Sequence, residues 1–289
     1  MKFGVSSMIA PLKKVAVMKP GKALINADPQ IWHYSKKFNP DKVSENHEEF
    51  IKLLKDFGTE VYFLSEDDKG IADSVFTYDA SLMTPLGAII MSPGKKLRSG
   101  EEKIHRKFYE SNKIPIIGSI EGSGKAEAGD TLWLDEKTLI VGRGFRTNED
   151  GANQLIRIFN SLGIKVHKVD LPVFYGQEAC LHLMSLISIV DEKKAIVYMP
   201  LLPVALLELL INKGFSLIEA PKDEFFSSNT LNINVLAMSP GNCIMLSNLP
   251  ETQSALLKSG IRVKVFKGDE LCIGCEGGPT CLTRPLLRQ

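Results

Sequence analysis

The stretch "PTCLTRPLL" (279–287) decides the fold, because it reads as a strand for which no later segment of the chain can supply a partner. The first strand of the chain, "KKVAVMKP" (13–20), is the segment that can complete its sheet. Pairing between the two would join the ends of the chain and close a ring. We therefore expect a closed arrangement of sheets.

Between these two strands the chain repeats one pattern five times: a short apolar strand, an amphipathic helix, a tight turn, a second strand and a third strand. The first strands are "KKVAVMKP" from Lys13, "GAIIMSP" from Gly87, "KTLIVGR" from Lys137, "KAIVYMP" from Lys194 and "NCIMLSN" from Asn242. The helix ends with their second strands occupy 53–64, 108–119, 158–169, 209–220 and 256–266. The third strands are expected at 74–83, 125–134, 178–189, 229–238 and 279–287.

Glycine marks the helix end in four units, at Gly58, Gly163, Gly214 and Gly260, and Asn112 or Lys113 takes this place in the other. A repeat of roughly 45–60 residues is typical of propeller-like arrays. The fold class we predict is α/β, a five-bladed α/β-propeller with pseudo-five-fold repeats, as a single domain over residues 1–289. An ordinary doubly wound sheet explains alternating strands and helices, but not this five-fold recurrence.

The composition excludes several classes of protein. The chain has 289 residues, 44% of them hydrophobic, 24% charged, and a net charge of +1. A disordered chain, a nucleic-acid binder or a binder of anionic membranes would differ in these values. The apolar run 195–211 contains Pro200, Pro203 and Glu208, so we interpret it as a strand, a turn and a helix rather than a membrane span. With five cysteines and no apparent signal peptide, we expect a cytoplasmic protein.

Each expected third strand carries one polar residue in apolar surroundings: Asp79, Glu127, His182, Asn229 and Cys281. Taken singly, each has an ordinary structural explanation, such as a core histidine or a small buried cysteine. In a closed ring, however, equivalent positions converge on the axis. The repeat therefore predicts that these five side chains meet in one pocket.

The residue types in this pocket suggest a substrate. A thiol needs a base or a cation nearby to become a nucleophile near neutral pH, and a histidine supplies one. The carboxylates of Asp73, Asp79 and Glu127 would repel a developing oxyanion, but they match the N–H groups of a planar guanidinium. We expect thiolate attack on the carbon of a small guanidino compound, with no cofactor and no metal.

The chain resembles the guanidino-group-modifying enzymes, which are dimethylarginine dimethylaminohydrolases, arginine deiminases and amidinotransferases with the five-bladed pentein fold. The resemblance covers nearly the whole chain and runs in order through the units. Its motifs are "DSVFTYDASL" (73–82), "EAGD" (127–130), "GRGFRTN" (142–148), "LHL" (181–183), "SNTLN" (228–232) and "GGPTCLT" (277–283).

The resemblance implies roles for individual residues. Cys281 is similar to the family's nucleophile, His182 to its general acid/base and Glu127 to the carboxylate that orients both. Substrate binding is implied for five residues: Asp73 and Asp79 toward the guanidinium, Arg98 and Arg146 toward the α-carboxylate, and Asn229. The implied activity is hydrolysis of arginine or an Nω-methylated arginine to citrulline.

Several alternatives stay open. The "EAGD" motif has Ala128 where the family more often has glycine, and parts of the motifs also resemble cyanobacterial arginine dihydrolase. Arginine deiminase, arginine dihydrolase and amidinotransferase activity are therefore alternatives, as is a non-enzymatic, ribosome-binding pentein. A homodimer is a possible assembly.

Two further segments have open roles. Cys272, Cys275 and Cys281 have the spacing of half a zinc site, although a redox link between Cys272 and Cys275, or simple burial, also explains the first two. The long polar segment 21–46 is either a lid over the pocket or a surface loop.

Overall fold

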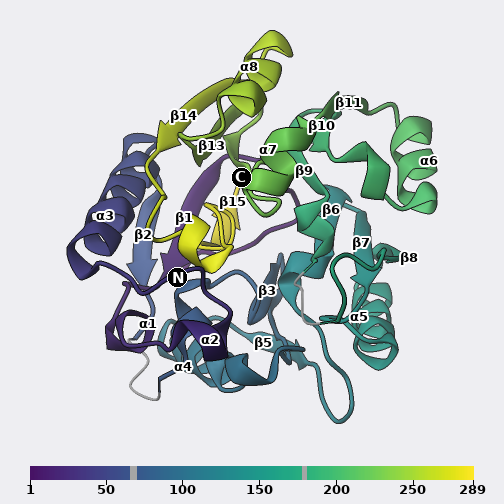
Figure 1. Cartoon of the computed structure of the whole chain (residues 1–289). Helices are drawn as coiled ribbons and strands as arrows, with labels where there is room; N and C mark the ends of the chain where they lie inside the picture. Colours follow the sequence, from purple (N-terminus) through teal and green to yellow (C-terminus); the bar gives the residue numbers. More distant parts are fainter. Residues whose placement is uncertain (66–69, 178–180) are drawn as a thin grey trace.

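Five three-stranded sheets form the fold (Figure 1), and the computed structural model describes residues 1–65, 70–177 and 181–289. In each sheet the middle strand pairs in parallel with one neighbour and antiparallel with the other. The sheets are β15 (Arg284–Arg288), β1 (Leu12–Val17) and β2 (Glu60–Phe63); β3 (Ser81–Thr84), β4 (Gly87–Ile90) and β5 (Ile116–Ser119); β6 (Thr131–Asp135), β7 (Thr138–Arg143) and β8 (Lys165–Asp170); β9 (Ile187–Asp191), β10 (Lys194–Val197) and β11 (Ser216–Glu219); and β12 (Leu236–Ser239), β13 (Asn242–Leu246) and β14 (Arg262–Phe266).

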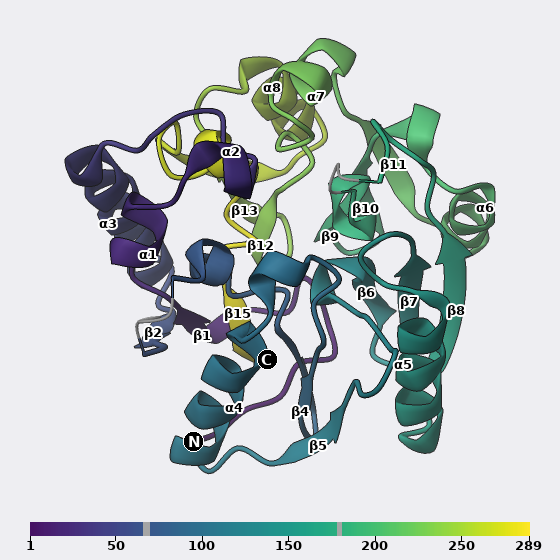
Figure 2. The ribbon, with the colours of Figure 1, turned by 60° about the horizontal axis from the view of Figure 1, so that its bottom comes forward.

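The first and last strands close the ring. β1 pairs antiparallel with β15, with Val15 opposite Pro285, and it pairs in parallel with β2. The five sheets stand around a common centre in both ribbon views (Figures 1 and 2). The predicted five-bladed α/β-propeller is confirmed, and so is its closure through the strand at the C-terminal end.

The long helices stand around the rim of the ring, one to a blade (Figure 2). They are α3 (Pro40–Asp56), α4 (Glu101–Ser111), α5 (Glu149–Ser161), α6 (Val204–Asn212) and α8 (Pro250–Lys258). The shorter ones are α1 (Lys22–Ile25), α2 (Pro29–Trp32) and α7 (Lys222–Ser227), with 3-10 turns η1 (Ala72–Val75), η2 (Lys96–Arg98), η3 (Ala128–Asp130), η4 (Leu183–Ser185), η5 (Met199–Leu201) and η6 (Ile273–Cys275).

The turns after these five rim helices have the predicted left-handed residue. Gly58, Gly163, Gly214 and Gly260 have φ values of 76°, 73°, 73° and 82°, and Lys113 takes the position in the remaining blade with φ 55°. Glycine adopts this conformation without the steric cost that a Cβ brings. The sequence therefore located all five helix ends correctly.

Aromatic side chains fill the core between the rim helices and the sheets. The rings of Phe50 and Phe266 lie 4.9 Å apart between α3 and β14, and those of Trp133 and Phe159 lie 5.6 Å apart between β6 and α5. Such pairs add to the free energy gained from burying apolar area. The core thus ties each rim helix to strands of the ring.

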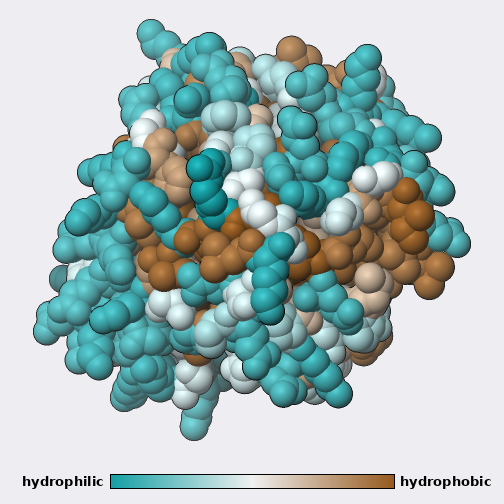
Figure 3. Space-filling view, turned by 90° about the horizontal axis from the view of Figure 1, so that it is seen from above, coloured by the Kyte–Doolittle hydropathy of each residue, from teal (hydrophilic) through white to brown (hydrophobic). Residues whose placement is uncertain are grey.

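The run 195–211 forms the end of β10, a 3-10 turn and α6, as expected from its prolines. The outer side of α6 remains apolar, with Val204 70% and Ile211 60% exposed. Figure 3 shows a band of apolar side chains across this face of the molecule, with one end over α6. None of the described helices is both long and apolar enough to cross a membrane. The homodimer and the cytoplasmic location stay predictions.

The third strands are shorter than predicted, and this corrects the sequence analysis. β3, β6, β9, β12 and β15 each begin several residues after the expected start, because the first part of each segment is a turn. Residues 178–180 of one expected strand lie outside the described residues. The residues expected to meet at the axis therefore lie in these turns, at 72–80, 127–130, 181–186, 228–235 and 277–283, which we call the axial turns.

Hydrogen bonds link each axial turn or its strand to the next one around the ring. Polar side chains supply most of these bonds, so they take the place of ladder hydrogen bonds that the turns do not make. The links are Gly129 N–H to Asp79 Oδ1 (2.9 Å), Leu183 N–H to Asp130 Oδ1 (2.9 Å), Ser188 O–H to the Ile233 carbonyl (2.6 Å), Thr280 N–H to Asn234 Oδ1 (2.9 Å) and Tyr78 N–H to the Cys281 carbonyl (3.1 Å).

We predict that Asp130→Ala lowers the free energy of unfolding by about 1–3 kcal/mol, because it leaves the buried Leu183 N–H without an acceptor. Asp130→Asn is the matched control, since it keeps an oxygen acceptor and should cost clearly less. Urea unfolding near pH 7 measures both. Equal losses in the two variants would show that the hydrogen bond to Leu183 is not the stabilising contact.

Candidate active site

A cleft of about 520 Å³ opens where the axial turns meet, within the size range of small-molecule sites. Seven of the eight predicted site residues line this cleft, and the exception is Glu127, which is fully buried. The seven are Asp73, Asp79, Arg98, Arg146, His182, Asn229 and Cys281. The repeat argument thus brought residues from distant parts of the chain to one place.

Glu127, at the N-terminal end of η3, is the most heavily hydrogen-bonded of these residues. Its Oε2 lies 2.7 Å from His182 Nε2 and accepts from Arg146 Nη1 at 2.7 Å. Its Oε1 accepts from the backbone N–H groups of Gly94 and Lys95 at 2.9 and 3.2 Å. Burial opposes ionisation, but the Arg146 charge and the His182 hydrogen bond hold the pKa of Glu127 well below its ordinary value. Glu127 is therefore a buried carboxylate that fixes the orientation of His182.

Asp79 belongs to a second group, built around Arg98 in η2. Arg98 donates from Nη1 to Asp79 Oδ2 at 2.5 Å, and from Nε and Nη2 to Glu101 at 2.8 Å each. Burial would raise the pKa of Asp79, but the charges of His182 and Arg98 hold it below its ordinary value. Arg98 is 4% exposed, and its guanidinium neutralises the buried carboxylates of Asp79 and Glu101. The structure thus places Arg98 inside the charge network, although it was expected to bind the substrate's α-carboxylate.

The glycine of the "EAGD" motif, Gly129, occupies a position where the fold leaves no room for a side chain. A Cβ at this position would come within 2.8 Å of Asp79 Oδ1 and of His182 Cγ. The absence of a side chain lets the turn pass between these two groups while its N–H donates to Asp79. Ala128, the departure from the family motif, is fully buried and faces no such constraint.

The polar segment 21–46 borders the cleft. Trp32 and His33 line it, and the Tyr34 hydroxyl donates to Asp73 Oδ1 at 2.6 Å. The other oxygen of Asp73 pairs with Lys95 Nζ at 2.7 Å, and this ammonium lies 5.3 Å from the centre of the Trp32 ring. The segment therefore forms a wall of the cleft, and its movement as a lid stays a prediction.

Cys281 lies in the axial turn before β15. Its sulfur accepts a hydrogen bond from Asn234 Nδ2 at 3.0 Å. Burial, with the nearby charge of Asp79, raises the pKa of Cys281 to about 11, although Gly278, Asn234 and His182 act in the opposite direction. In the free protein the thiol is therefore protonated at neutral pH.

Asn234 is the residue that the sequence analysis missed. It stands two residues before β12, as Asp79 stands two residues before β3, whereas the expected residue, Asn229, is exposed and donates to Glu276 at 3.1 Å. The expected strand began at residue 229, so Asn229 was taken as the equivalent position. The other axial residues stand at different offsets from their strands, so no single offset in the sequence would have indicated Asn234.

Three groups could hold a metal ion, since Asp79, Glu127 and His182 offer ligand atoms within 4.8 Å of one another. Arg98 and Arg146 donate to these two carboxylates through their planar guanidinium groups. The carboxylates therefore accept N–H donors in the arrangement that a substrate guanidinium offers. That the site works without a metal ion stays a prediction.

The remaining cysteines do not form a cluster with Cys281. Within the described part of the chain, Cys272, Cys275 and Cys281 do not form a three-ligand metal group, and they are free thiols, as is Cys243. Cys272 is fully buried and Cys275 is partly buried against the cleft. Of the two alternatives for Cys272 and Cys275, the structure shows free, largely buried thiols and no disulfide between them. Cys180 lies outside the described residues.

The chain has relatives among known proteins. The chain is 27% identical over 285 residues to the uncharacterized protein YkgA of Bacillus subtilis, and the alignment covers 96% of this chain and 92% of that protein. It is 26% identical to the N(G),N(G)-dimethylarginine dimethylaminohydrolase of Pseudomonas aeruginosa, over 84% of this chain and 87% of that one. It is also 25% identical to the arginine deiminase of Listeria welshimeri, of which it spans 53%.

The fold is shared with solved structures. A mutant of the Pseudomonas aeruginosa dimethylarginine dimethylaminohydrolase in complex with citrulline superposes with a TM-score of 0.78 at 25% identity, over 96% of this chain and all of that one. The family described as N,N dimethylarginine dimethylhydrolase, eukaryotic, matches residues 16–288. The chain belongs to this family, and it is a hydrolase that acts on C–N bonds of guanidino groups.

Proposed function

We propose that the protein hydrolyses the guanidinium group of free arginine or an Nω-methylated arginine to citrulline, through a covalent intermediate on Cys281. The observation that carries this proposal is the pairing of His182 with the buried carboxylate of Glu127 in the same cleft as the Cys281 thiol. The cleft thus combines a nucleophile, a proton carrier and carboxylates for a cation.

The first half of the reaction transfers the amidino carbon to sulfur. The substrate guanidinium binds against Asp79 and Glu127, and its positive charge favours ionisation of the Cys281 thiol. The thiolate attacks the guanidinium carbon and gives a tetrahedral adduct. His182, held by Glu127, accepts the proton of the Cys281 thiol and then delivers it to the departing amine, and the C–N bond breaks to leave an amidino-thioether on Cys281.

The second half returns the enzyme to its starting state. A water molecule attacks the same carbon while His182 accepts its proton. The C–S bond breaks, the product leaves as citrulline, and the departing Cys281 thiolate regains a proton from His182. Ammonia or a methylated amine was released in the first half, so hydrolysis of both kinds of substrate uses the same residues.

The two arginines take different roles in this proposal. Arg98 is a positioning residue, because its guanidinium is held by Asp79 and Glu101 beneath the cleft. Arg146, in the loop after β7, donates to Glu127 and lines the cleft. We assign Arg146 to the substrate's α-carboxylate, which it would bind after the substrate guanidinium takes its place at Glu127. Asp73 and Asn229, nearer the entrance, complete the substrate-binding set.

We predict that Cys281→Ala abolishes citrulline formation and that His182→Asn lowers kcat by about 10²–10⁴-fold. Cys272→Ala is the matched control and should retain activity, because Cys272 does not line the cleft. The assay is a panel of arginine and its methylated forms, with ammonia, methylamines, citrulline and ornithine quantified. Intact mass after rapid quenching should reveal the amidino adduct in the wild type and not in Cys281→Ala.

The same panel separates the alternatives. Release of ammonia from arginine alone would assign a deiminase, and further release of ammonia with ornithine formation would assign a dihydrolase. Transfer of the amidino group to an added amine, with ornithine left behind, would assign an amidinotransferase. Full activity in Cys281→Ala would remove the proposed mechanism altogether.

We predict that iodoacetamide inactivates the free enzyme at a rate that rises about tenfold per pH unit between pH 7 and 10, because only the thiolate reacts and the pKa of Cys281 is about 11. Below that pKa each unit of pH multiplies the thiolate fraction tenfold. Peptide mapping identifies the alkylated residue, and Cys281→Ala should lose this label. A rate that levels off near pH 7 would contradict a protonated resting thiol.

We predict that Arg146→Ala raises KM for arginine substrates by about 10–100-fold with a smaller effect on kcat, since a charge-assisted hydrogen bond to the α-carboxylate is lost. Arg146→Lys should recover part of the affinity. A substrate analogue without the α-carboxylate provides the control, because it should be indifferent to the change. A fall in kcat with unchanged KM would mean that Arg146 acts only through Glu127.

A further inference from the structure

A second, much smaller cavity lies behind the active site, and we call it the axial cavity. Leu82, Trp133, Ser188, Leu236 and Arg284 line it, one residue from each of the five third strands β3, β6, β9, β12 and β15. Those strands meet only at the centre of the ring, so the cavity lies on the axis. Tyr78, Met184 and Thr280 line both this cavity and a pocket that reaches Asp79, His182 and Cys281.

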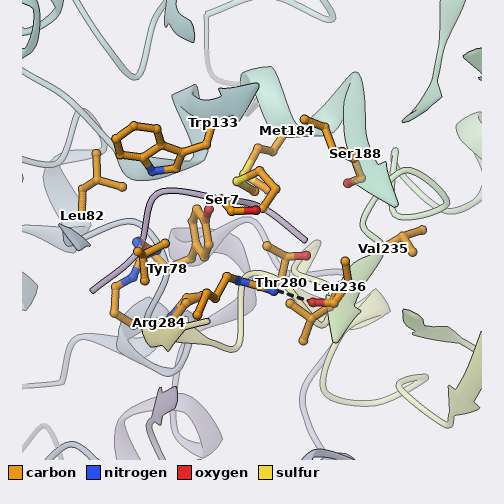
Figure 4. A pocket seen from close by; sticks show the side chains of 16 residues that line it. Ser7, Tyr78, Leu82, Trp133, Met184, Ser188, Val235, Leu236, Thr280 and Arg284 are labelled. Atoms are coloured by element: carbon orange, nitrogen blue, oxygen red, sulfur yellow. Dashed lines mark hydrogen bonds between the residues drawn. The ribbon is translucent and has the colours of Figure 1, made fainter. Parts of the chain in front are cut away.

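Three buried hydrogen-bond donors at this cavity have no partner. Five buried side-chain atoms in the described part of the chain lack one, and Trp133 Nε1, Thr280 Oγ1 and Arg284 Nε are three of them. Their residues are 2%, 3% and 1% exposed. Figure 4 shows these side chains around the cavity. An indole N–H and a guanidinium N–H can only donate, so their missing partner must accept.

The cavity also lacks a negative charge. Arg284 donates from Nη1 to the carbonyls of Tyr78 and Ser81 at 2.8 and 2.6 Å, and Arg288 donates to the carbonyls of Ala10 and Ala237 at 2.8 Å each. Among the residues that the structure describes, no carboxylate lies within ion-pair distance of either guanidinium.

Two buried cations without counter-charge are costly. Burial and the charge of Arg284 lower the pKa of Arg288 to about 10, so it keeps its charge at neutral pH. The phenol of Tyr78 does not compensate, since burial raises its pKa and keeps it neutral. The arrangement therefore calls for a negative group from outside the chain.

We propose that the axial cavity binds one small monovalent anion, such as chloride, through the N–H groups of Trp133 and Arg284. The cavity volume of about 20 Å³ holds roughly one water-sized group, which excludes sulfate and phosphate. A water molecule could accept from these two donors but would leave both arginines without a counter-charge. A halide satisfies the donors and the charge together.

The test compares thermal unfolding of the full chain in sodium chloride, sodium bromide and sodium gluconate at equal ionic strength. Chloride and bromide should raise Tm by about 2–4 °C per tenfold increase in concentration once the site begins to fill, whereas gluconate should not. Crystals grown in bromide should give an anomalous peak within contact distance of Trp133 Nε1 and Arg284 Nε.

Two variants connect the effect to this cavity. Trp133→Phe removes one donor with little change of shape, and it should weaken the dependence on halide. Thr283→Val is the matched control, because its hydroxyl bonds to the Thr280 carbonyl and does not line the cavity. It should lower Tm but keep the halide dependence. Equal Tm in halide and gluconate, with no anomalous peak in bromide crystals, would show that water fills the cavity and would overturn the proposal.

Discussion

The hydrogen bonds between successive axial turns are the constraint on which the site depends. A closed ring brings the starts of five strands together at its centre. Backbone N–H groups are buried there, and they have no neighbouring strand with which to form the hydrogen bonds of a sheet. Polar side chains of the neighbouring turn accept them, as Asp79 does for Gly129 and Asn234 for Thr280. Carboxylates and amides are therefore needed at the axis for folding before any substrate is considered. The two residues then serve the site as well, since Asp79 borders the cleft and Asn234 donates to the Cys281 sulfur.

The buried carboxylates are stable at the axis because arginines compensate them. Glu127 and Asp79 lie in an environment that opposes ionisation, yet Arg146 and Arg98 hold both pKa values below their ordinary range. Arg98 pairs with both Asp79 and Glu101, and its displacement would leave these two buried carboxylates without a counter-charge. Arg146 pairs with Glu127 and lines the cleft, and in the proposed reaction a substrate guanidinium takes its place at Glu127. The site is thus built around the ion pair that the substrate itself would form.

Sequence periodicity predicted the elements whose signals are local. Apolar first strands, rim helices and the glycines that end them each depend on a few neighbouring residues, and the ring closure followed from pairing the strands left over at the two ends. The start of the third strands could not be predicted in the same way, because an apolar turn and an apolar strand have similar residue compositions. Asn229 was named at the expected strand start, and Asn234 was not considered, for this reason. The ion pairs that Arg98 and Arg146 form within the protein were also beyond the sequence, since they depend on which carboxylates the fold places beside each guanidinium.

The two ends of the ring axis carry opposite charge, and the turn before β15 separates them. Asp79 lines the cleft and Glu127 is buried next to it, whereas Arg284 and Arg288 border the axial cavity behind it. Cys281 lies at the boundary, and its neighbour Thr280 lines the cavity as well as the pocket that Cys281 shares with His182. Burial and the charge of Asp79 raise the pKa of Cys281 to about 11, whereas Asn234 and His182 act in the opposite direction. The thiol is therefore controlled by groups around the cleft, where in the proposed reaction an arriving guanidinium supplies the positive charge only when there is a substrate to attack.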